Sequence, residues 1–383
     1  MSPIRSAGRC LVLTIAFLAA APVSAQRYFF EQVGVDRGLP ASKVYAVLQD
    51  GYGTVWIGTE AGLAAYDGRQ VRSIGTQDGA APGGARSLLL DRQGRLWVGH
   101  LDGGITVHDG DRFQAYAVGE GMPSAVTGLA EDVNGTIWLA TAGSGAWRIP
   151  PMEDLPTTLA ATRVGASELR DKLLGACALK DGRSCFVEDG GTILVTRDGT
   201  GFEPLDMPGI PQVFRFTALF QHSSGDLWVG TIGGGAFRLP ANGAPTVRYD
   251  IPAGLGSETV FCFGEDARQR TWVGTLDGGL SCIDGDEVRT FDPRNGLHTS
   301  FVRCIGRDRE GNLLIGTNDN GLDIFKGERF VSFGEPDGLA DPRVWAVLED
   351  RQGSTWFGTD NGIVVLGRKG SVDRTITVQD GQL

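Results

Sequence analysis

The chain has 383 residues and a formal net charge of −11 at pH 7, with 46 acidic against 35 basic side chains. Such an acidic surface argues against nucleic acid and anionic lipid as partners. Glycine, at 58 residues, has about twice its usual share and indicates many tight turns, whereas six cysteines are too few for a disulfide framework.

The first 25 residues have the features of a secretory signal peptide. Arg5 and Arg9 form a basic start, residues 10–21 form a short apolar run, and Val23-Ser24-Ala25 fits the small-x-small cleavage rule. We expect a mature chain that begins at Gln26 and a periplasmic location. The apolar run is too short to cross a bilayer as a helix, which makes a permanent anchor the weaker alternative.

A short apolar strand then recurs through residues 26–383, the predicted sensor domain. Eight copies can be anchored at one position, and their spacing of 41 to 47 residues fits a four-stranded propeller blade. Six anchors are tryptophans and two copies are degenerate, the anchors in chain order being Trp56, Trp97, Trp138, Cys185, Trp228, Trp272, Leu314 and Trp356. The longest interval contains an insertion from Pro150 to Arg170, which either marks a functional face or is a plain surface loop.

Within the eighth unit, turn residues separate four short strands. We expect strands at Arg329–Phe333, Val344–Leu348, Thr355–Phe357 and Ile363–Val365. The fold class is therefore all-β, a β-propeller of four-stranded antiparallel blades. Eight units allow a seven-bladed ring followed by one further blade, which we favour, or a single eight-bladed ring. Tyr28 to Val33 can supply the outer strand that closes the ring.

Comparison of the units separates packing positions from variable ones. In six units an Asp closes the first strand, and the residue six positions before it is always apolar, as expected of a shared core. The residue five positions before it varies without chemical relation, as Tyr45, Arg86, Thr127, Phe261, Arg303 and Trp345. We take Tyr45, Arg86, Arg303 and Trp345 as candidate ligand-binding residues at one mouth of the central channel. The alternative is a variable surface without a ligand.

No catalytic, cofactor or metal motif emerges from the remaining chemistry. His100, His108, His222 and His298 stand at unrelated places in their units, and we predict no metal site and no cofactor. Cys177 and Cys185 flank a predicted Asp181-Gly182 turn, so a disulfide between them is one option. Cys262 and Cys304 occupy the same place in adjacent units.

A run of residues that starts at Gly38 reads Gly-Leu-Pro-x3-Val-x5-Asp-x2-Gly-x2-Trp-Ile-Gly-Thr. This run resembles the two-component regulator propeller repeat. The resemblance extends from about Phe29 to the end of the sequence, and the unit from Leu173 to Ile193 departs from it. It implies the extracytoplasmic sensor half of a hybrid histidine kinase or of a membrane-bound diguanylate cyclase. Such receptors continue into a second propeller, a β-sandwich, a transmembrane helix and a cytoplasmic output module, so the chain is expected to be truncated relative to them.

Three functions are compatible with a propeller, because the fold alone does not determine activity. The leading expectation is a non-enzymatic sensor that binds a small molecule or oligosaccharide, contacts the membrane only through missing downstream segments, and forms a homodimer in the full-length receptor. The alternatives are a propeller enzyme, a lyase or hydrolase, and a protein-interaction scaffold.

Overall fold

The structure is a computed structural model that describes residues 27–116, 125–165, 172–197, 201–327, 331, 332, 334, 338–367 and 372–377. The predicted signal peptide lies outside these residues. The chain forms two compact units, Arg27–Ser332 and Phe333–Leu383. Helical structure in the described part is limited to three short 3-10 turns, at Val35–Arg37, Thr76–Asp78 and Pro293–Asn295. None of the helices found there has the length and apolar character needed to cross a membrane.

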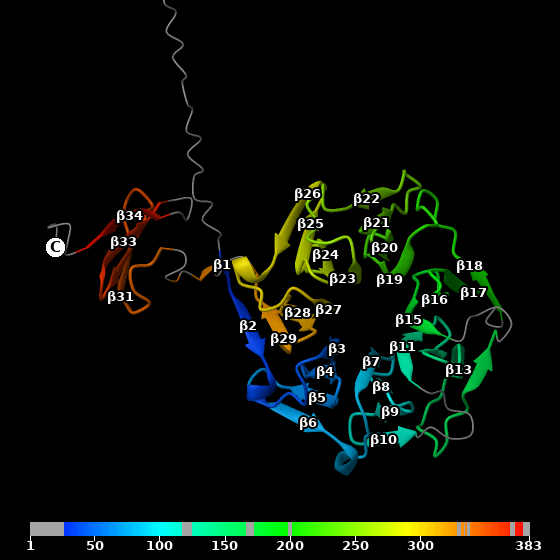
Figure 1. Cartoon of the computed structure of the whole chain (residues 1–383). Helices are drawn as coiled ribbons and strands as arrows, with labels where there is room; N and C mark the ends of the chain where they lie inside the picture. The colour runs from blue at the N-terminus through cyan, green and yellow to red at the C-terminus, as the bar shows by residue number, and fades with distance from the viewer. Residues whose placement is uncertain are drawn as a thin grey trace, which may run out of the picture. The chain divides into compact units, whose positions relative to one another are not determined.

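The unit Arg27–Ser332 is a ring of seven four-stranded antiparallel sheets, numbered here as blades 1 to 7 (Figure 1). Blade 1 consists of β3 (Val44–Gln49), β4 (Val55–Thr59), β5 (Gly62–Tyr66) and β6 (Val71–Ile74). Blade 2 consists of β7 (Ala85–Leu90), β8 (Leu96–His100), β9 (Ile105–His108) and β10 (Phe113–Tyr116). Blade 3 consists of β11 (Val126–Glu131), β12 (Ile137–Thr141), β13 (Ala146–Ile149) and β14 (Thr162–Val164). Blade 4 consists of β15 (Leu173–Ala178), β16 (Ser184–Glu188), β17 (Ile193–Arg197) and β18 (Gly201–Pro204). Blade 5 consists of β19 (Arg215–Gln221), β20 (Leu227–Ile232), β21 (Ala236–Leu239) and β22 (Val247–Tyr249). Blade 6 consists of β23 (Val260–Glu265), β24 (Thr271–Thr275), β25 (Leu280–Asp284) and β26 (Glu287–Phe291). Blade 7 consists of β27 (Val302–Arg307), β28 (Leu313–Thr317), β29 (Leu322–Phe325) and β2 (Phe30–Val33).

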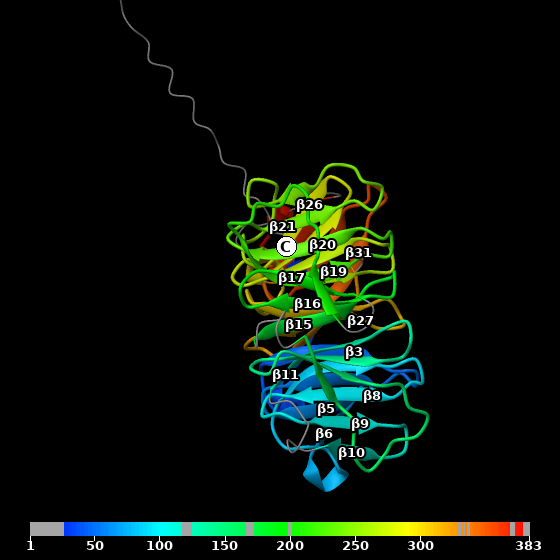
Figure 2. The same ribbon diagram turned by 90° about the vertical axis from the view of Figure 1, so that its right-hand side faces the viewer.

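The first strand of each blade is innermost, around the central opening (Figure 1). Neighbouring inner strands contact each other in chain order, and β27 of blade 7 contacts β3 of blade 1. Seen from the side, the strands run from one face of the ring to the other (Figure 2). The prediction of a propeller of four-stranded antiparallel blades is confirmed, with seven blades rather than eight in the ring.

The outer strand of blade 7 comes from the start of the described chain. Strand β2 pairs antiparallel with β29, with Phe30 opposite Phe325 and Val33 opposite Leu322. Phe30 is buried and its ring stacks on that of Phe325 at 4.8 Å between centroids. This pairing covers an edge that would otherwise expose unpaired backbone groups. The expected closing strand is therefore confirmed for Phe30–Val33, whereas Tyr28 belongs to β1, which pairs with another strand.

Each anchor side chain of the ring lies in an apolar layer between its own blade and the next. Trp97 of blade 2 packs with Ile137 and Leu139 of blade 3, and Trp272 of blade 6 packs with Val302 of blade 7. The degenerate anchors take the same place, Cys185 between blades 4 and 5 and Leu314 between blades 7 and 1. A recurring buried side chain of this kind is what the periodic Trp predicted.

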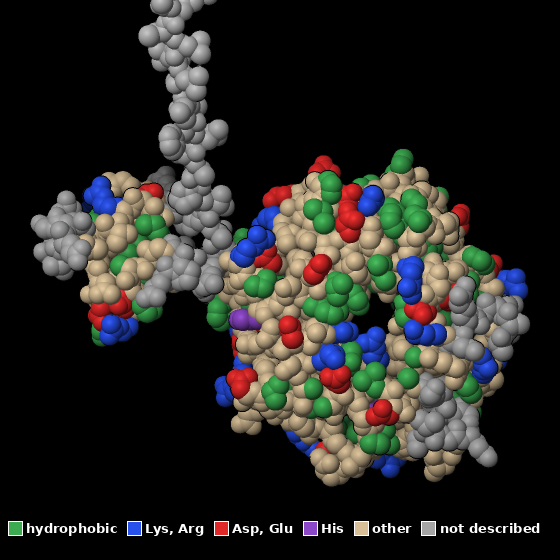
Figure 3. Space-filling model, in the orientation of Figure 1, with side chains coloured by type: hydrophobic (Ala, Val, Ile, Leu, Met, Phe, Trp, Pro, Cys, Tyr) green, Lys and Arg blue, Asp and Glu red, His purple; other side chains and the backbone are tan. Residues whose placement is uncertain are grey.

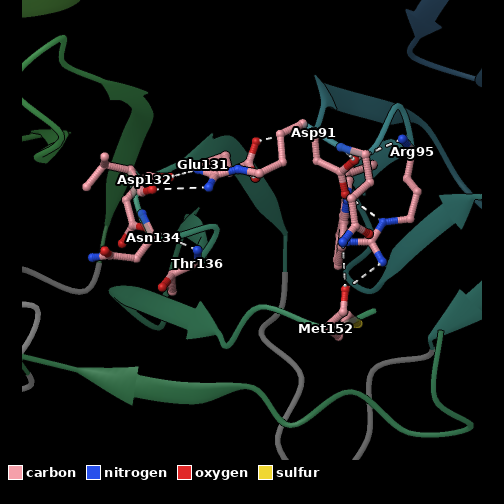
Figure 4. Close-up of polar contacts among 11 residues, drawn as sticks. Asp91, Arg95, Glu131, Asp132, Asn134, Thr136 and Met152 are labelled. Carbon is pink, nitrogen blue, oxygen red and sulfur yellow. Dashed lines mark hydrogen bonds and ion pairs between the residues drawn. The ribbon is translucent and has the colours of Figure 1, made fainter. Parts of the chain in front are cut away.

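In the six repeats that contain it, the Asp at the end of the first strand organises the hairpin between the first two strands. At Asp91, one carboxylate oxygen accepts backbone hydrogen bonds from Gln93 and Arg95, while the other accepts from the Trp97 indole at 2.8 Å and from Arg95 Nε at 2.7 Å. Figure 4 shows how Arg95 also reaches the carbonyl of Met152. One carboxylate thus fixes the turn, the anchor and an arginine, which explains the spacing Asp-x2-Gly-x2-Trp.

The Gly that follows the anchor allows the next blade to approach. A Cβ at Gly274 would lie 2.6 Å from Val302 Cγ1, and a Cβ at Gly316 would lie 2.7 Å from Val44 Cγ1. Both distances are shorter than real contacts, so neither position accepts a side chain without displacing its neighbour. The apolar residue six positions before the Asp is the one that fills this space.

The described part of the insertion, residues 150–165, packs against blades 2 and 3 and includes β14, the outer strand of blade 3. Met152 and Leu155 contact the apolar layer between blades 2 and 3, and the Tyr116 hydroxyl donates to the Pro156 carbonyl at 2.8 Å. These contacts support a structural role for this part of the loop.

The unit Phe333–Leu383 contains one more four-stranded sheet, blade 8, formed by β31 (Val344–Glu349), β32 (Thr355–Thr359), β33 (Gly362–Leu366) and β34 (Val372–Ile376). The expected strand at Arg329–Phe333 is not part of this sheet. Its described residues Val331–Ser332 form β30, which pairs with β1 (Arg27–Tyr28), and the outer strand of blade 8 is β34. Sequence patterns place strands well, but they do not show which sheet an outer strand joins.

Candidate functional site

Every inner strand of the ring contains a β-bulge near its start. In blade 1 the pairing with β4 steps from Val44 to Ala46 and leaves Tyr45 without a partner. The same step occurs in all the other blades, including blade 8. The unpaired residues in chain order are Tyr45, Arg86, Thr127, Leu174, Thr217, Phe261, Arg303 and Trp345. A bulge redirects one side chain away from the alternation of the strand, and bulges are frequent beside functional sites.

The seven bulge residues of the ring line one cavity of about 340 Å³ at its centre. Further lining comes from β15, β19 and β23, including Cys177, Phe220 and Cys262. Each blade contributes one bulge residue, so the identity of these seven side chains sets the chemistry of the cavity. These side chains face the cavity and not the packed layers between blades, so the shared core does not fix their identity.

Three adjacent blades form a basic and aromatic sector of the cavity. The Arg86 guanidinium lies 4.6 Å from the centre of the Tyr45 ring, and the Arg303 guanidinium lies 5.3 Å from it. Burial lowers the pKa of Arg86, and the positive charge of Arg303 lowers it further. Burial likewise lowers the pKa of Arg303. Figure 3 shows Lys and Arg side chains at the edge of the central hollow.

Neighbouring side chains hold Arg303 in place. Its Nε donates to Asn318 Oδ1 at 2.7 Å, and its guanidinium lies 4.5 Å from the Phe301 ring centre. Phe301 in turn makes an edge contact with Phe261 at 4.8 Å between centroids. The charged group is therefore oriented before any ligand arrives.

The structure brings together three of the four predicted ligand-binding residues, Tyr45, Arg86 and Arg303. Trp345, the fourth, belongs to blade 8 in the other compact unit and does not line this cavity. Its side chain is 77% exposed, and its indole N–H donates to Asp360. Trp345 shares the bulge position with the other three residues, but its strand β31 belongs to blade 8 and not to one of the seven blades that line the cavity.

Sequence comparison missed Leu174 and Thr217, because their units have no Asp at the end of the first strand. Counting from the anchor would have found them, since every bulge residue stands eleven positions before its anchor. Leu174 precedes Cys185 and Thr217 precedes Trp228 by this interval.

The cysteines of the ring are free thiols. Cys177 and Cys185 lie directly opposite each other in β15 and β16, as the predicted hairpin requires, and the Cys185 thiol donates to the Cys177 carbonyl at 3.3 Å without a disulfide. Burial raises the pKa of Cys304 to about 12. Thiols with raised pKa values are poor nucleophiles.

The four histidines all lie away from the cavity lining. His100 contacts Thr106, His222 contacts Ser224, and His298 contacts Asp323, each within the framework of its blade. In the part of the chain that the structure describes, no three His, Cys, Asp or Glu side chains are placed to hold a metal ion.

Comparison with known proteins relates the repeats and the ring to existing families. A family model described as two component regulator propeller matches residues 38–61, in blade 1, and 338–361, in blade 8. No curated protein matches the sequence.

Solved structures share the fold at low identity. The extracellular domain of a hybrid two-component system from B. thetaiotaomicron has a TM-score of 0.69 and 20% identity over 91% of this chain and 49% of its own. A second such domain from the same organism has a TM-score of 0.64 and 20% identity over 92% of this chain and 47% of its own. A virginiamycin B lyase from Staphylococcus aureus has a TM-score of 0.61 and 13% identity over 77% of this chain and 98% of its own.

At these identities the likeness shows the fold, which a lyase also shares. The chain spans about half the length of the two extracellular domains. The matched repeats and the seven-bladed ring identify this chain as a β-propeller protein that carries two-component regulator propeller repeats.

Proposed function

We propose that the chain is the extracytoplasmic ligand-binding sensor propeller of a bacterial signalling receptor, and that its ligand binds in the central cavity. The observation that carries the proposal is the ring of bulges. Seven otherwise similar strands each direct one side chain into the same space, and these seven side chains differ in charge, size and polarity. Structural packing alone would favour the same residue in each copy, as it does at the anchor.

The cavity suits a small polar molecule. Its volume of about 340 Å³ lies at the small end of the usual range for ligand pockets, roughly 300–1,000 Å³. Tyr45 and Phe261 offer aromatic surface on which a sugar ring can pack, while arginine and threonine side chains provide polar contacts. The output module and the membrane segment of the receptor belong to the same proposal and rest on the matched repeats.

The test is a thermal-shift screen of the purified chain against sugars, sugar acids and small metabolites, followed by calorimetry on the best ligand. Tyr45→Ala and Phe261→Ala are each expected to weaken binding at least about fivefold, the usual loss for an aromatic contact worth about 1 kcal/mol. Tyr52→Ala is the matched control, because Tyr52 is 88% exposed and outside the cavity. A screen without any ligand, or equal affinities for all three variants, would refute the proposal.

A further inference from the structure

We propose that the ligand of the central cavity carries an acidic group, a carboxylate or a sulfate, and that Arg86 and Arg303 bind this group beside the Tyr45 ring. The inference rests on the proposed function and adds the chemical class of the ligand. It makes the cavity an anion site at the centre of a protein whose overall charge is strongly negative.

The first observation is that the two charges lack counterions among the described residues. The buried arginines of the hairpins have them, since Arg95 Nε lies 2.7 Å from Asp91 and Arg270 Nε lies 2.7 Å from Asp266. Arg86 and Arg303 are different, because no carboxylate of the described residues forms an ion pair with either of them.

Glu60 is the acidic residue whose charge acts on Arg303, but its carboxylate is engaged with Lys43 Nζ at 2.7 Å. Two partly desolvated guanidinium groups near one ring repel each other, and a ligand anion between them would remove that repulsion.

The second observation is that the hydrogen-bond donors needed for an anion are available. Arg303 uses Nε for Asn318, and no other hydrogen bond of its guanidinium involves a described residue. The Arg86 guanidinium lies against the face of Tyr45 and makes no hydrogen bond to a described residue. A planar guanidinium with free N–H groups matches the two oxygens of a carboxylate or sulfate in a bidentate manner.

The third observation is that the sector is oriented in advance. Asn318 and Phe301 fix the Arg303 guanidinium, and Tyr45 lies against both arginines. The remaining bulge residues, Thr127, Leu174, Thr217 and Phe261, are uncharged and complete the wall. A sugar acid fits this division, with its acidic group at the arginines and its ring against the aromatic and uncharged part.

The experiment measures the melting temperature of the purified chain with sulfate, glucuronate or glucose, each against chloride at equal ionic strength. Sulfate and glucuronate are expected to raise it by at least about 2 °C at saturating concentration, and glucose is not. Arg86→Gln and Arg303→Gln should abolish the response. Arg72→Gln should keep it, because Arg72 is an exposed arginine that pairs with Asp78 outside the cavity.

A second readout needs no ligand. If Arg86 and Arg303 form an unoccupied anion site, Arg86→Gln removes a repulsive charge, so the ligand-free variant melts at a higher temperature than the parent. A structural arginine would give a lower melting temperature, and that result overturns the inference.

The two proposals fail in different ways. A neutral ligand whose binding depends on Tyr45 but not on Arg86 would leave the sensor function intact and overturn the anion site. The absence of any sulfate or glucuronate effect beyond ionic strength would do the same. A response retained by both arginine variants would place the anion elsewhere and overturn the inference as well.

Discussion

At the scale of single residues, the pair His298 and Asp323 shows how a buried carboxylate is accommodated. Asp323 is fully buried in β29, where one oxygen lies 2.8 Å from His298 Nδ1 and the other accepts the His298 backbone N–H at 3.1 Å. The hydrogen bond to Asp323 raises the pKa of His298, against the opposing effect of burial. No local motif in the sequence predicts this pair, because its members stand 25 residues apart and belong to different elements.

This pair predicts a pH dependence of stability. Below the ordinary imidazole pKa of about 6.5, His298 is protonated in the folded and the unfolded chain, and the ion pair contributes fully. As the pH rises, the unfolded chain loses this proton first, and the contribution disappears once the pH passes the raised pKa of the folded state. The unfolding free energy of the parent should therefore fall more steeply above pH ~6.5 than that of His298→Gln, as measured by urea unfolding across this range. Parallel curves for the two proteins would contradict the role of the pair.

At the scale of elements, the hairpin held by an Asp was the most predictable feature of the chain. The recurrence of Asp, Gly and Trp at fixed spacing predicted the strands and turns of blades 1, 2, 3 and 8, because one carboxylate makes the same backbone and indole hydrogen bonds in each. The bulges were predictable only as a position that varies, since a two-residue alternation contains no sign of an unpaired residue. In blades 4 and 5 the Asp is replaced, and there the comparison failed for Leu174 and Thr217.

The same hairpin allows a comparison within the molecule. Although burial alone raises the pKa of Asp266, hydrogen bonds from Trp272 and Arg270 outweigh it and lower the pKa. Asp266→Ala removes the buried carboxylate that pairs with Arg270 Nε and accepts the Trp272 indole N–H, and it should destabilise the protein by about 3–5 kcal/mol.

Asp308→Ala in blade 7 is the control for this hairpin. Asn312 and Leu314 there take the places of the arginine and the Trp, and a hydrogen bond from a neutral donor to a carboxylate is worth only about 1.5–3 kcal/mol. Urea unfolding of the two variants gives the comparison, and equal losses would show that the ion pair adds nothing to the turn.

At the scale of the whole molecule, local sequence did not decide how many blades form the ring. All eight units have similar strands, and the ring has seven blades because β2 completes the sheet of β27, β28 and β29. The number of blades depends on a pairing between distant segments and on the twist accumulated over all the blades, and neither can be predicted from the sequence of a single unit.

The closing strand can be tested with two adjacent residues. Phe30 is 4% exposed and stacks on Phe325, whereas Phe29 is 44% exposed. Phe30→Ala should cost about 3–5 kcal/mol of unfolding free energy, the usual loss for a buried aromatic side chain. Phe29→Ala should cost far less, since surface substitutions are usually within about 0.5 kcal/mol. If both variants had the same urea midpoint, β2 would not be a structural part of the ring.

The closure by β2 also sets the timing of folding. The Gln32 side chain contacts the carbonyl of Asn320 across 288 positions of sequence, so β2, near the start of the described chain, completes its sheet only when the last blade of the ring has formed. At 5–20 residues per second, a ribosome needs roughly 15–60 s to produce the intervening chain. Throughout this interval the apolar faces of blade 1 that meet blade 7, around Val44 and Ile57, have no covering layer. Ring closure is therefore a late step of folding, and until blade 7 has formed, this face of blade 1 is exposed apolar surface of the kind that promotes aggregation.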